Sequence, residues 1–211
     1  MPNVIRPGFS FENPEELNEM GVLRRLEKAG RTCYKSEGNI GVDSASDFIR
    51  RIMALGHESI LEHEKVTVRI VCDRGVTHEI VRHRIASYSQ ESTRYCNYSG
   101  ARFGGVITVI QPCFWEENTK MYDLWFAAME HAESIYLQLL KDGASPQEAR
   151  SVLPNALKTE IVVTYNLREW RHFLRLRCSK KAHPQMREIA CAILSVFKEK
   201  LSVIFGDIPE E

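Results

Sequence analysis

The stretch from residue 65 to residue 73 constrains the fold of this chain more than any other segment. Apolar side chains alternate there with polar ones, Val66, Val68, Ile70 and Cys72 against Thr67 and Arg69. Successive side chains of a strand point to opposite faces, so the pattern predicts a strand. The sequences at 106–110 and 157–165 predict two further strands. Because the predicted strands do not alternate regularly with helices, we expect an α+β fold rather than a doubly wound parallel sheet. Its helices would pack on a small, mainly antiparallel sheet.

Capping residues and apolar periodicity predict the helices. Residues 13–16, Asn-Pro-Glu-Glu, have the form of a helix start, and this helix is expected to run to about Ala29. Ser145-Pro146-Gln147-Glu148 is a second start of the same form. The other predicted helices span 44–55, 76–83, 118–141, 168–178 and 184–205, with a short turn at 59–62. The sequence contains no repeat and no long linker, so we expect residues 1–211 to form a single domain.

Composition excludes several classes of protein. The chain has 28 Lys and Arg against 28 Asp and Glu, which argues against a dedicated nucleic-acid-binding protein. No apolar run is long enough to span a membrane, and the first residues lack the pattern of a signal peptide. The six cysteines are spread singly, without a CxxC pair, which is typical of reduced thiols in a core. We therefore expect a cytoplasmic protein with no nucleic-acid or membrane partner.

Against this neutral background, one short segment is strongly basic. Arg82-His83-Arg84 is followed by seven residues, Ser92 and then Arg94. Arginine binds phosphate or carboxylate through two parallel hydrogen bonds, and serine and threonine hydroxyls add neutral donors. A solvated basic loop is the alternative interpretation. Ile85, Ala86, Tyr88 and Tyr95 interleave with the charges, which favours a partly buried wall and hence an anion site.

A second arginine segment lies near the carboxyl terminus, in NLREWRHFLRLR at 166–177. On a helix, Arg171 and Arg175 share one face, and for them we favour a solvated surface. Helical spacing places Arg177 instead beside Trp170, Phe173 and Leu174. A cation among apolar side chains requires a partner, such as an anionic ligand or a carboxylate.

Other catalytic patterns are weak or missing. A metal site could be suspected at His57, Glu62 and His63. However, the HExxH motif would need a histidine at position 61, which is leucine. We therefore expect no metal. Ser92 lies in no GxSxG elbow, and neither a Walker loop nor GxGxxG is present. The residues alone therefore predict an anion-binding protein for nucleotide-like ligands, held by arginines from two distant segments, without identifying a reaction.

At these residues the chain closely resembles the flavin-dependent thymidylate synthases. Their signature is Arg-His-Arg, seven residues and then Ser, which Arg82-His83-Arg84 and Ser92 fit without gaps. Further blocks that resemble the family occur in order, at GHES and LEH around His57, ARSVLP at 149–154, NLR at 166–168, and HFL followed by LR at 172–177. The resemblance as a whole covers roughly residues 20 to 200.

The resemblance implies a reductive methylation of dUMP to dTMP. In that reaction 5,10-methylenetetrahydrofolate supplies the carbon, NADPH is the reductant, and FAD carries the hydride. No enzyme nucleophile attacks the uracil, which agrees with Ser92 lacking a base. The family is homotetrameric with sites shared between subunits, so the two arginine segments would meet at an interface.

The resemblance also implies site residues. Arg177 would be catalytic, polarising the uracil and favouring ionisation at the ring nitrogen between its carbonyls. The implied cofactor-binding residues are His57, Ser59, Arg82, His83, Arg84, Gln90, Asn166, Arg168 and His172. The implied substrate-binding residues are Glu79, Arg82, Gln90, Glu91, Ser92, Arg94, Arg150 and Arg177. Gln90 stands where the family often has Glu, Glu79 where it often has Gln, and His172 where some members have Asn; each keeps a polar side chain.

Two alternatives explain one cluster each. A non-catalytic nucleotide- or RNA-binding module would use the same arginines for phosphates, with steeply salt-dependent binding and no bound chromophore. A metal hydrolase built on His57, Glu62 and His63 would retain stoichiometric zinc. The enzyme interpretation explains both arginine segments and the order of the blocks between them.

Overall fold

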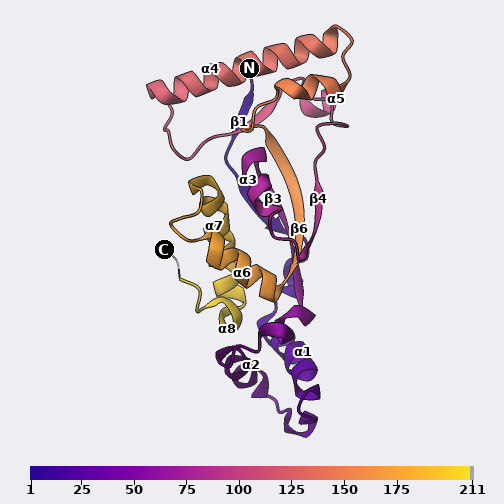
Figure 1. Cartoon of the computed structure of the whole chain (residues 1–211), viewed down its shortest axis with the longest axis vertical. Helices are drawn as coiled ribbons and strands as arrows, with labels where there is room; N and C mark the ends of the chain where they lie inside the picture. Colours follow the sequence, from indigo (N-terminus) through magenta and orange to yellow (C-terminus); the bar gives the residue numbers. More distant parts are fainter. Residues whose placement is uncertain (210–211) are drawn as a thin grey trace. The chain divides into compact units, whose positions relative to one another are not determined.

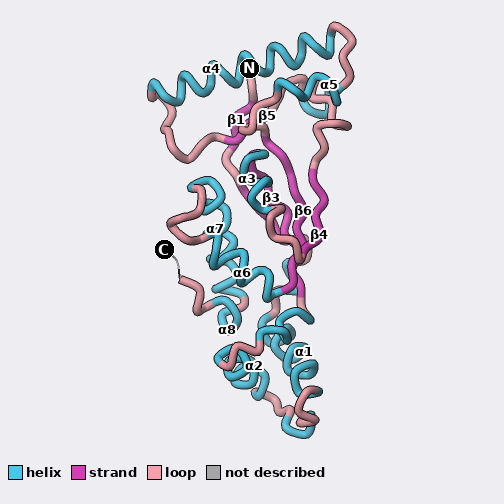
Figure 2. Tube along the Cα trace, in the orientation of Figure 1, coloured by secondary structure: helices cyan, strands magenta, loops and turns pink. Residues whose placement is uncertain are grey.

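The computed structural model describes residues 1–209 (Figures 1 and 2). The α-helices are α1 (Glu19–Thr32), α2 (Ser44–Ala54), α3 (Arg74–Ile80), α4 (Lys120–Lys141), α5 (Pro146–Ala149), α6 (Leu167–Arg177), α7 (Pro184–Lys200) and α8 (Ser202–Phe205). The strands are β1 (Asn3–Ile5), β2 (Gly8–Phe11), β3 (Lys65–Asp73), β4 (Ala86–Gln90), β5 (Thr108–Ile110) and β6 (Lys158–Asn166). Short 3₁₀ turns are η1 (Pro14–Glu16), η2 (Glu37–Asn39), η3 (Glu58–His63), η4 (Ala101–Phe103) and η5 (Arg150–Val152). No helix among residues 1–209 is both long and apolar enough to cross a membrane.

The strands form a four-stranded sheet in the order β2-β3-β6-β4 and a separate parallel pair of β1 and β5. Two contacts show that β3 and β6 run in opposite directions. The Leu167 N–H donates to the Glu64 carbonyl at 2.9 Å, and the hydroxyls of Thr67 and Thr164 are 2.8 Å apart. Residue numbers therefore rise along one strand as they fall along the other, which is antiparallel pairing. The predicted α+β class with a small, mainly antiparallel sheet is confirmed.

The chain divides into two compact units, each assembled from three segments. Unit 1 comprises residues 1–8, 70–82 and 89–161, and unit 2 comprises residues 9–69, 83–88 and 162–211. The long strands β3 and β6 contribute residues to both units. That residues 1–211 form a single domain stays a prediction.

The core of unit 1 gathers under α4. Tyr136 is fully buried, its ring lies 5.9 Å from that of Tyr98, and its hydroxyl accepts from the Tyr98 N–H at 3.3 Å. Ile107 and Val109 complete this cluster with Met129 and Leu157 from the helix and the sheet. Burial of large aromatic side chains such as these contributes most of the hydrophobic stabilisation of a small unit.

The core of unit 2 is aromatic and lies around α6 and α7, which pack together (Figure 1). Trp170 is fully buried between Tyr165 and Phe197, at ring-centroid distances of 4.6 and 5.3 Å. Its indole N–H donates to the Val66 carbonyl at 3.0 Å, so α6 is tied to strand β3. This packing fixes which face of α6 remains available for chemistry.

The first helix differs from the prediction. Residues 14–16 form only the turn η1, and α1 begins at Glu19, because Asn18 accepts the Gly21 N–H at 3.2 Å whereas Asn13 makes no side-chain cap. Gly30 lies inside this helix rather than ending it. Its hydrogen lets the helix approach the Phe48 ring, which an added Cβ would meet at 2.7 Å.

Other boundaries also differ. The final predicted helix is interrupted at Leu201, whose φ of −137° is not helical, so α7 and α8 are separate. The basic segment after Val81 contains strand β4, which its polar sequence ASYSQ did not indicate. Strands β1 and β2 were missed because they are short. Of the six cysteines only Cys72 and Cys178 are buried, so the prediction of core thiols is wrong for Cys33 and Cys113, which are exposed.

Candidate functional site

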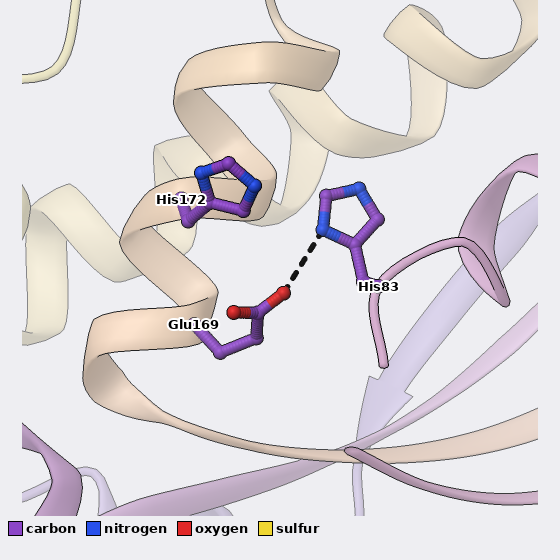
Figure 3. Close-up of side chains that lie close together, drawn as sticks. All are labelled: His83, Glu169 and His172. Atoms are coloured by element: carbon purple, nitrogen blue, oxygen red, sulfur yellow. Dashed lines mark hydrogen bonds and ion pairs between the residues drawn. The ribbon is translucent and has the colours of Figure 1, made fainter. Parts of the chain in front are cut away.

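A buried histidine organises the polar cluster of unit 2. His83 follows α3 and is 5 % exposed. Its Nδ1 lies 3.0 Å from a carboxylate oxygen of Glu169, and its Nε2 accepts a hydrogen bond from Arg177 Nε at 3.2 Å (Figure 3 shows the first contact). Both ring nitrogens therefore have partners, and both partners come from α6.

The sequence of α6 explains why these side chains converge. Asn166 caps the helix by accepting the Glu169 N–H at 2.8 Å. Glu169 and His172 are then three residues apart, on neighbouring turns of one face, as Figure 3 shows. The ring of His172 is 5.4 Å from that of His83, and the ring of Phe173 meets His83 edge-on at 4.9 Å.

The hydrogen bonds assign the protonation state of His83. A nitrogen that accepts from Arg177 carries no proton, so the neutral ring has its proton on Nδ1, where it donates to Glu169. Burial, followed by the charges of Arg177 and His172, lowers the pKa of His83 from 6.5 to about 4. His83 is therefore neutral at pH 7, in agreement with the hydrogen bonds.

The carboxylate partner is also buried. Glu169 is 7 % exposed, and this burial raises the pKa of its carboxyl group, while His172 and Arg168 act in the opposite direction. A carboxylate removed from water is stabilised by hydrogen bonds to its oxygens, and the His83 Nδ1–H supplies one.

Two tyrosines hold the backbone of His83. The Tyr88 hydroxyl donates to the His83 carbonyl, and the Tyr165 hydroxyl lies 2.9 Å from that of Tyr88. Because the Tyr88 proton points to the carbonyl, Tyr165 donates to Tyr88. Burial raises the pKa of both phenols, so they stay protonated at neutral pH.

A pocket of about 370 Å³ opens beside this cluster. Its lining residues are Glu58, Glu62, Ile85, Asn166, Arg168, Glu169, His172 and Arg175. Three of the predicted cofactor-binding residues, Asn166, Arg168 and His172, are thus brought together. Arg168 pairs with Glu62 at 2.5 Å. Because both side chains are exposed, an anionic ligand could replace Glu62 as the partner of the Arg168 guanidinium.

Arg171 contradicts the prediction of a solvated face. It is 1 % exposed, donates to the Ile204 carbonyl, and forms two hydrogen bonds with Asp207 at 2.6 and 2.7 Å. Glu58 approaches its Nε at 3.4 Å. The prediction from helical spacing failed because the Ile204 carbonyl of α8 and the Asp207 carboxylate that follows α8 enclose Arg171, and the sequence of α6 does not contain that information. Arg175 is exposed as expected and also pairs with Asp207, at 3.0 Å.

The predicted phosphate-binding residues lie in unit 1. Arg94 Nε donates to Gln147 at 3.2 Å, and Arg150 donates to the buried Thr93 hydroxyl at 3.5 Å. The Ser92 hydroxyl accepts the Arg94 N–H at 3.3 Å. The residues from Ser92 to Arg94 and Arg150 are therefore neighbours in unit 1. Both guanidinium groups are exposed, which suits capture of an anion.

Three further predicted residues in unit 1 have protein partners. Gln90 donates to Thr77 and Thr159 at 3.1 and 3.3 Å. Glu91 accepts from Lys158 at 2.9 Å and from the Tyr98 hydroxyl at 2.9 Å. Glu79 lies on α3 and is partly buried.

The remaining predicted residues are exposed. Arg82 and Arg84 flank the buried His83, and Ser59 lies in η3. His57 is exposed, with its Nδ1 3.5 Å from the Tyr34 hydroxyl. Ile85 and Tyr95 are 66 % and 76 % exposed, so the predicted partly buried wall is wrong for these two side chains in the single chain.

The possible metal ligands that lie together are not the ones named in the metal-hydrolase alternative. Within residues 1–209 the ligand atoms of His83, Glu169 and His172 lie within 4.8 Å of one another, whereas His57, Glu62 and His63 form no such group. A metal on His83 Nδ1 would move the ring proton to Nε2, directly against the Arg177 N–H. The observed donor pattern therefore opposes a metal at this position.

Glu169 is the site residue that the sequence did not reveal. Its position next to the capping Asn166 made it resemble an acid in the first turn of a helix, which is common for structural reasons alone. The available signal was its spacing, because Glu169 and His172 lie one turn apart and on the side of α6 that leads to Arg177.

The chain is similar to one known protein family over most of its length. The family described as "Thymidylate synthase complementing protein" matches residues 17–201. A flavin-dependent thymidylate synthase of Geobacter sulfurreducens is 40 % identical over 189 residues, covering 85 % of this chain and 78 % of that protein. One of Corynebacterium efficiens is 35 % identical over 209 residues, covering 90 % and 81 %.

Among solved structures, a UMP/dUMP methylase from Streptomyces cacaoi, bound with 5-Br dUMP, has a similar fold. The TM-score is 0.76 at 22 % identity, and the match covers 97 % of this chain and 95 % of that one.

Proposed function

This chain belongs to the flavin-dependent thymidylate synthases, and from that membership we propose that it methylates dUMP to dTMP. In the proposed reaction 5,10-methylenetetrahydrofolate gives its one-carbon unit to C5 of the uracil, and NADPH supplies the hydride equivalent that reduces this carbon to a methyl group. The C5 proton is lost, the two nitrogens that held the methylene group each take up a proton, so that one proton is consumed overall, and tetrahydrofolate and NADP⁺ are the other products. The observation that carries the proposal is the family match over residues 17–201.

The residues of unit 2 suit a flavin. Besides three carboxylates and Ile85, the pocket beside His83 is lined by four residues with donor groups that match the carbonyl and phosphate oxygens of FAD, namely Asn166, Arg168, His172 and Arg175. Its volume of about 370 Å³ is near the lower end of small-molecule sites, so it suits one portion of a dinucleotide. When bound, FAD would pass the hydride from NADPH to the one-carbon unit.

The proposed flavin-binding set extends beyond this pocket. It comprises His57, Ser59, Arg82, His83, Arg84, Gln90, Asn166, Arg168 and His172. Arg82 and Arg84 are exposed in the single chain and carry charges that suit a diphosphate.

The nucleotide would be held by fixed cations and hydroxyls. We assign the phosphate of dUMP to Ser92, Arg94 and Arg150, which are neighbours in unit 1 and expose both guanidinium groups. Glu79, Gln90, Glu91 and Arg82 complete the proposed substrate set. Arg82 and Gln90 provide bidentate and neutral donors of the kind that phosphate and uracil accept, whereas the carboxylates of Glu79 and Glu91 accept hydrogen bonds.

Arg177 is the proposed catalytic residue. A guanidinium beside a uracil carbonyl stabilises the negative charge that develops when the ring nitrogen ionises. Arg177 is partly buried and its Nε is held by His83, so the charge is pre-positioned in a region of low dielectric. No side chain needs to attack the ring, and Ser92 has no base that would make it a nucleophile.

We propose a homotetramer in the cytoplasm, with active sites at subunit interfaces. Ile85 and Tyr95 flank the basic segment and are largely exposed in the single chain. Large apolar side chains that are exposed in the single chain are typical of surfaces that another subunit covers.

The first test is the visible spectrum of the purified, dialysed protein. We expect the two bands of oxidised flavin, bleached by NADPH when dUMP is present, and dTMP formation once methylenetetrahydrofolate is added. A colourless protein that takes up no FAD as an intact oligomer, and binds oligonucleotides with a steep salt dependence, would refute the proposal.

A further inference from the structure

Glu169, His83 and Arg177 form a continuous chain of hydrogen bonds that the reaction as described does not require. Glu169 lies 3.0 Å from His83 Nδ1, and Arg177 Nε lies 3.2 Å from His83 Nε2. Glu169 and His83 are 7 % and 5 % exposed, so water does not compete strongly for these bonds. Phe173 packs edge-on against the imidazole and restricts its rotation.

Within this series of hydrogen bonds, the two outer residues, Glu169 and Arg177, determine which groups donate and which accept. Arg177 can only donate, and an ionised Glu169 can only accept. A neutral imidazole between them satisfies both neighbours in one tautomer alone, with the proton on Nδ1. The opposite tautomer would place Nε2–H against Arg177 Nε–H and leave a ring nitrogen facing a carboxylate, which is repulsive at both contacts.

We propose that Glu169 is a positioning residue for the methylation reaction, which holds His83 in the Nδ1–H tautomer so that its Nε2 orients Arg177. Glu169 lines the pocket assigned to the flavin, but in this role it acts through His83 and not through a contact with substrate or cofactor. The bond to Nε fixes one edge of the planar guanidinium, and this sets the direction of its two terminal nitrogens. This inference depends on the proposed function, because it assigns Glu169 to the same site.

The effect of removing Glu169 follows from this order. In Glu169→Ala the Nδ1–H of a buried ring loses its acceptor, and the Nε2–H tautomer becomes accessible. That tautomer cannot accept from Arg177, so the guanidinium loses its fixed orientation. In Glu169→Gln the amide oxygen can still accept from Nδ1–H, so the tautomer is retained although the charge is lost.

The catalytic test compares the two variants. We expect Glu169→Ala to lower kcat at least about tenfold while the KM for dUMP changes less than about threefold, because a misdirected catalytic group affects the transition state. Glu169→Gln should retain kcat within about threefold of wild type. Wild-type kcat in Glu169→Ala, or an equal loss in both variants, would overturn the proposal.

A matched control separates this role from general destabilisation. Glu27 is a fully buried carboxylate of unit 2 that pairs with Arg31 on α1 at 2.7 Å. Glu27→Ala removes a comparable buried acceptor, so its thermal midpoint should fall as in Glu169→Ala. Its kcat should stay at the wild-type value below that midpoint. A kcat loss in Glu27→Ala equal to that in Glu169→Ala would show that both variants act through stability, and would overturn the proposal.

The tautomer itself can be measured without flavin. In protein labelled with ¹⁵N-histidine, long-range ¹H–¹⁵N spectra distinguish protonated from unprotonated ring nitrogens, and the His83→Gln spectrum assigns the signal. We expect protonated Nδ1 in wild type and Glu169→Gln, and a shift toward Nε2–H in Glu169→Ala. Protonated Nε2 in wild type would overturn the proposal, as would zinc retained stoichiometrically and lost in Glu169→Ala. A wild-type protein that forms no dTMP would instead refute the proposed function, whatever the tautomer.

Discussion

Acidification should destabilise this protein through His83. In the unfolded chain a histidine has its ordinary pKa of 6.5, whereas burial, followed by the charges of Arg177 and His172, lowers the pKa of folded His83 to about 4. Between these values the unfolded state binds more protons than the folded state, so stability falls as the pH falls. The contribution is fully present above pH 6.5 and is lost progressively down to pH 4.

The magnitude follows from the two pKa values. Between pH 7 and pH 5 the linkage relation gives a loss of about 2 kcal/mol from this one group. For a chain of this size that corresponds to a fall in Tm of about 4–8 °C. Glu169 acts in the opposite direction, because burial raises its pKa and a protonated Glu169 favours the folded state at low pH. Its carboxyl group therefore offsets part of the loss toward pH 5.

The assay is differential scanning calorimetry of wild type and His83→Gln at pH 7 and pH 5. Both proteins share every other titrating group, so the difference between their pH-dependent changes in Tm isolates His83. We expect wild type to lose more Tm than His83→Gln, and a control variant of the exposed His131 on α4 to follow wild type. Equal losses in wild type and His83→Gln would refute a buried, neutral His83.

Two further predictions concern arginines of α6. Arg177→Ala should lower kcat at least about hundredfold while the flavin bands remain, because it removes charge stabilisation at the reacting ring, and near-normal turnover would contradict the assigned role. Hydrogen bonds from Arg171, followed by the charges of Arg171 and Arg175, lower the pKa of Asp207 to about 2, so its contribution is present above pH 3.8 and is lost toward pH 2. Asp207→Asn should therefore lower the free energy of unfolding at pH 7 by about 1 kcal/mol, which is small because the Asp207 side chain is half exposed. The variant should also lack the loss of stability that protonation of Asp207 causes in wild type between pH 3.8 and pH 2. Urea titrations from pH 7 to pH 2 measure both effects, and unchanged stability at pH 7 would show that Arg171 is satisfied by Glu58 and the Ile204 carbonyl alone.

Much of the secondary structure could be predicted from local sequence. The alternation of Val66, Val68 and Ile70 identified β3 with its bounds, because side-chain period and burial agree in a sheet with one covered face. The helix start predicted at Ser145 is confirmed, and there Ser145 forms a capping box with Glu148. The predicted start of a helix was wrong where two nearby residues could each cap it. Between residues 13 and 19 two asparagines are possible caps, and only Asn18 caps the helix.

The sequence by itself also determined the chemical inventory: two arginine segments, a neutral overall charge and the order of blocks that identifies the family. The tertiary structure decided what each charge does. Arg171 and Arg177 belong to the same helix, yet Arg171 is buried against the Ile204 carbonyl and Asp207 while Arg177 donates to His83. Glu169 acquires its role from a histidine 86 residues away. Hydrogen bonds between distant segments depend on how helices pack on a sheet, and the periodicity of one helix carries no information about that packing.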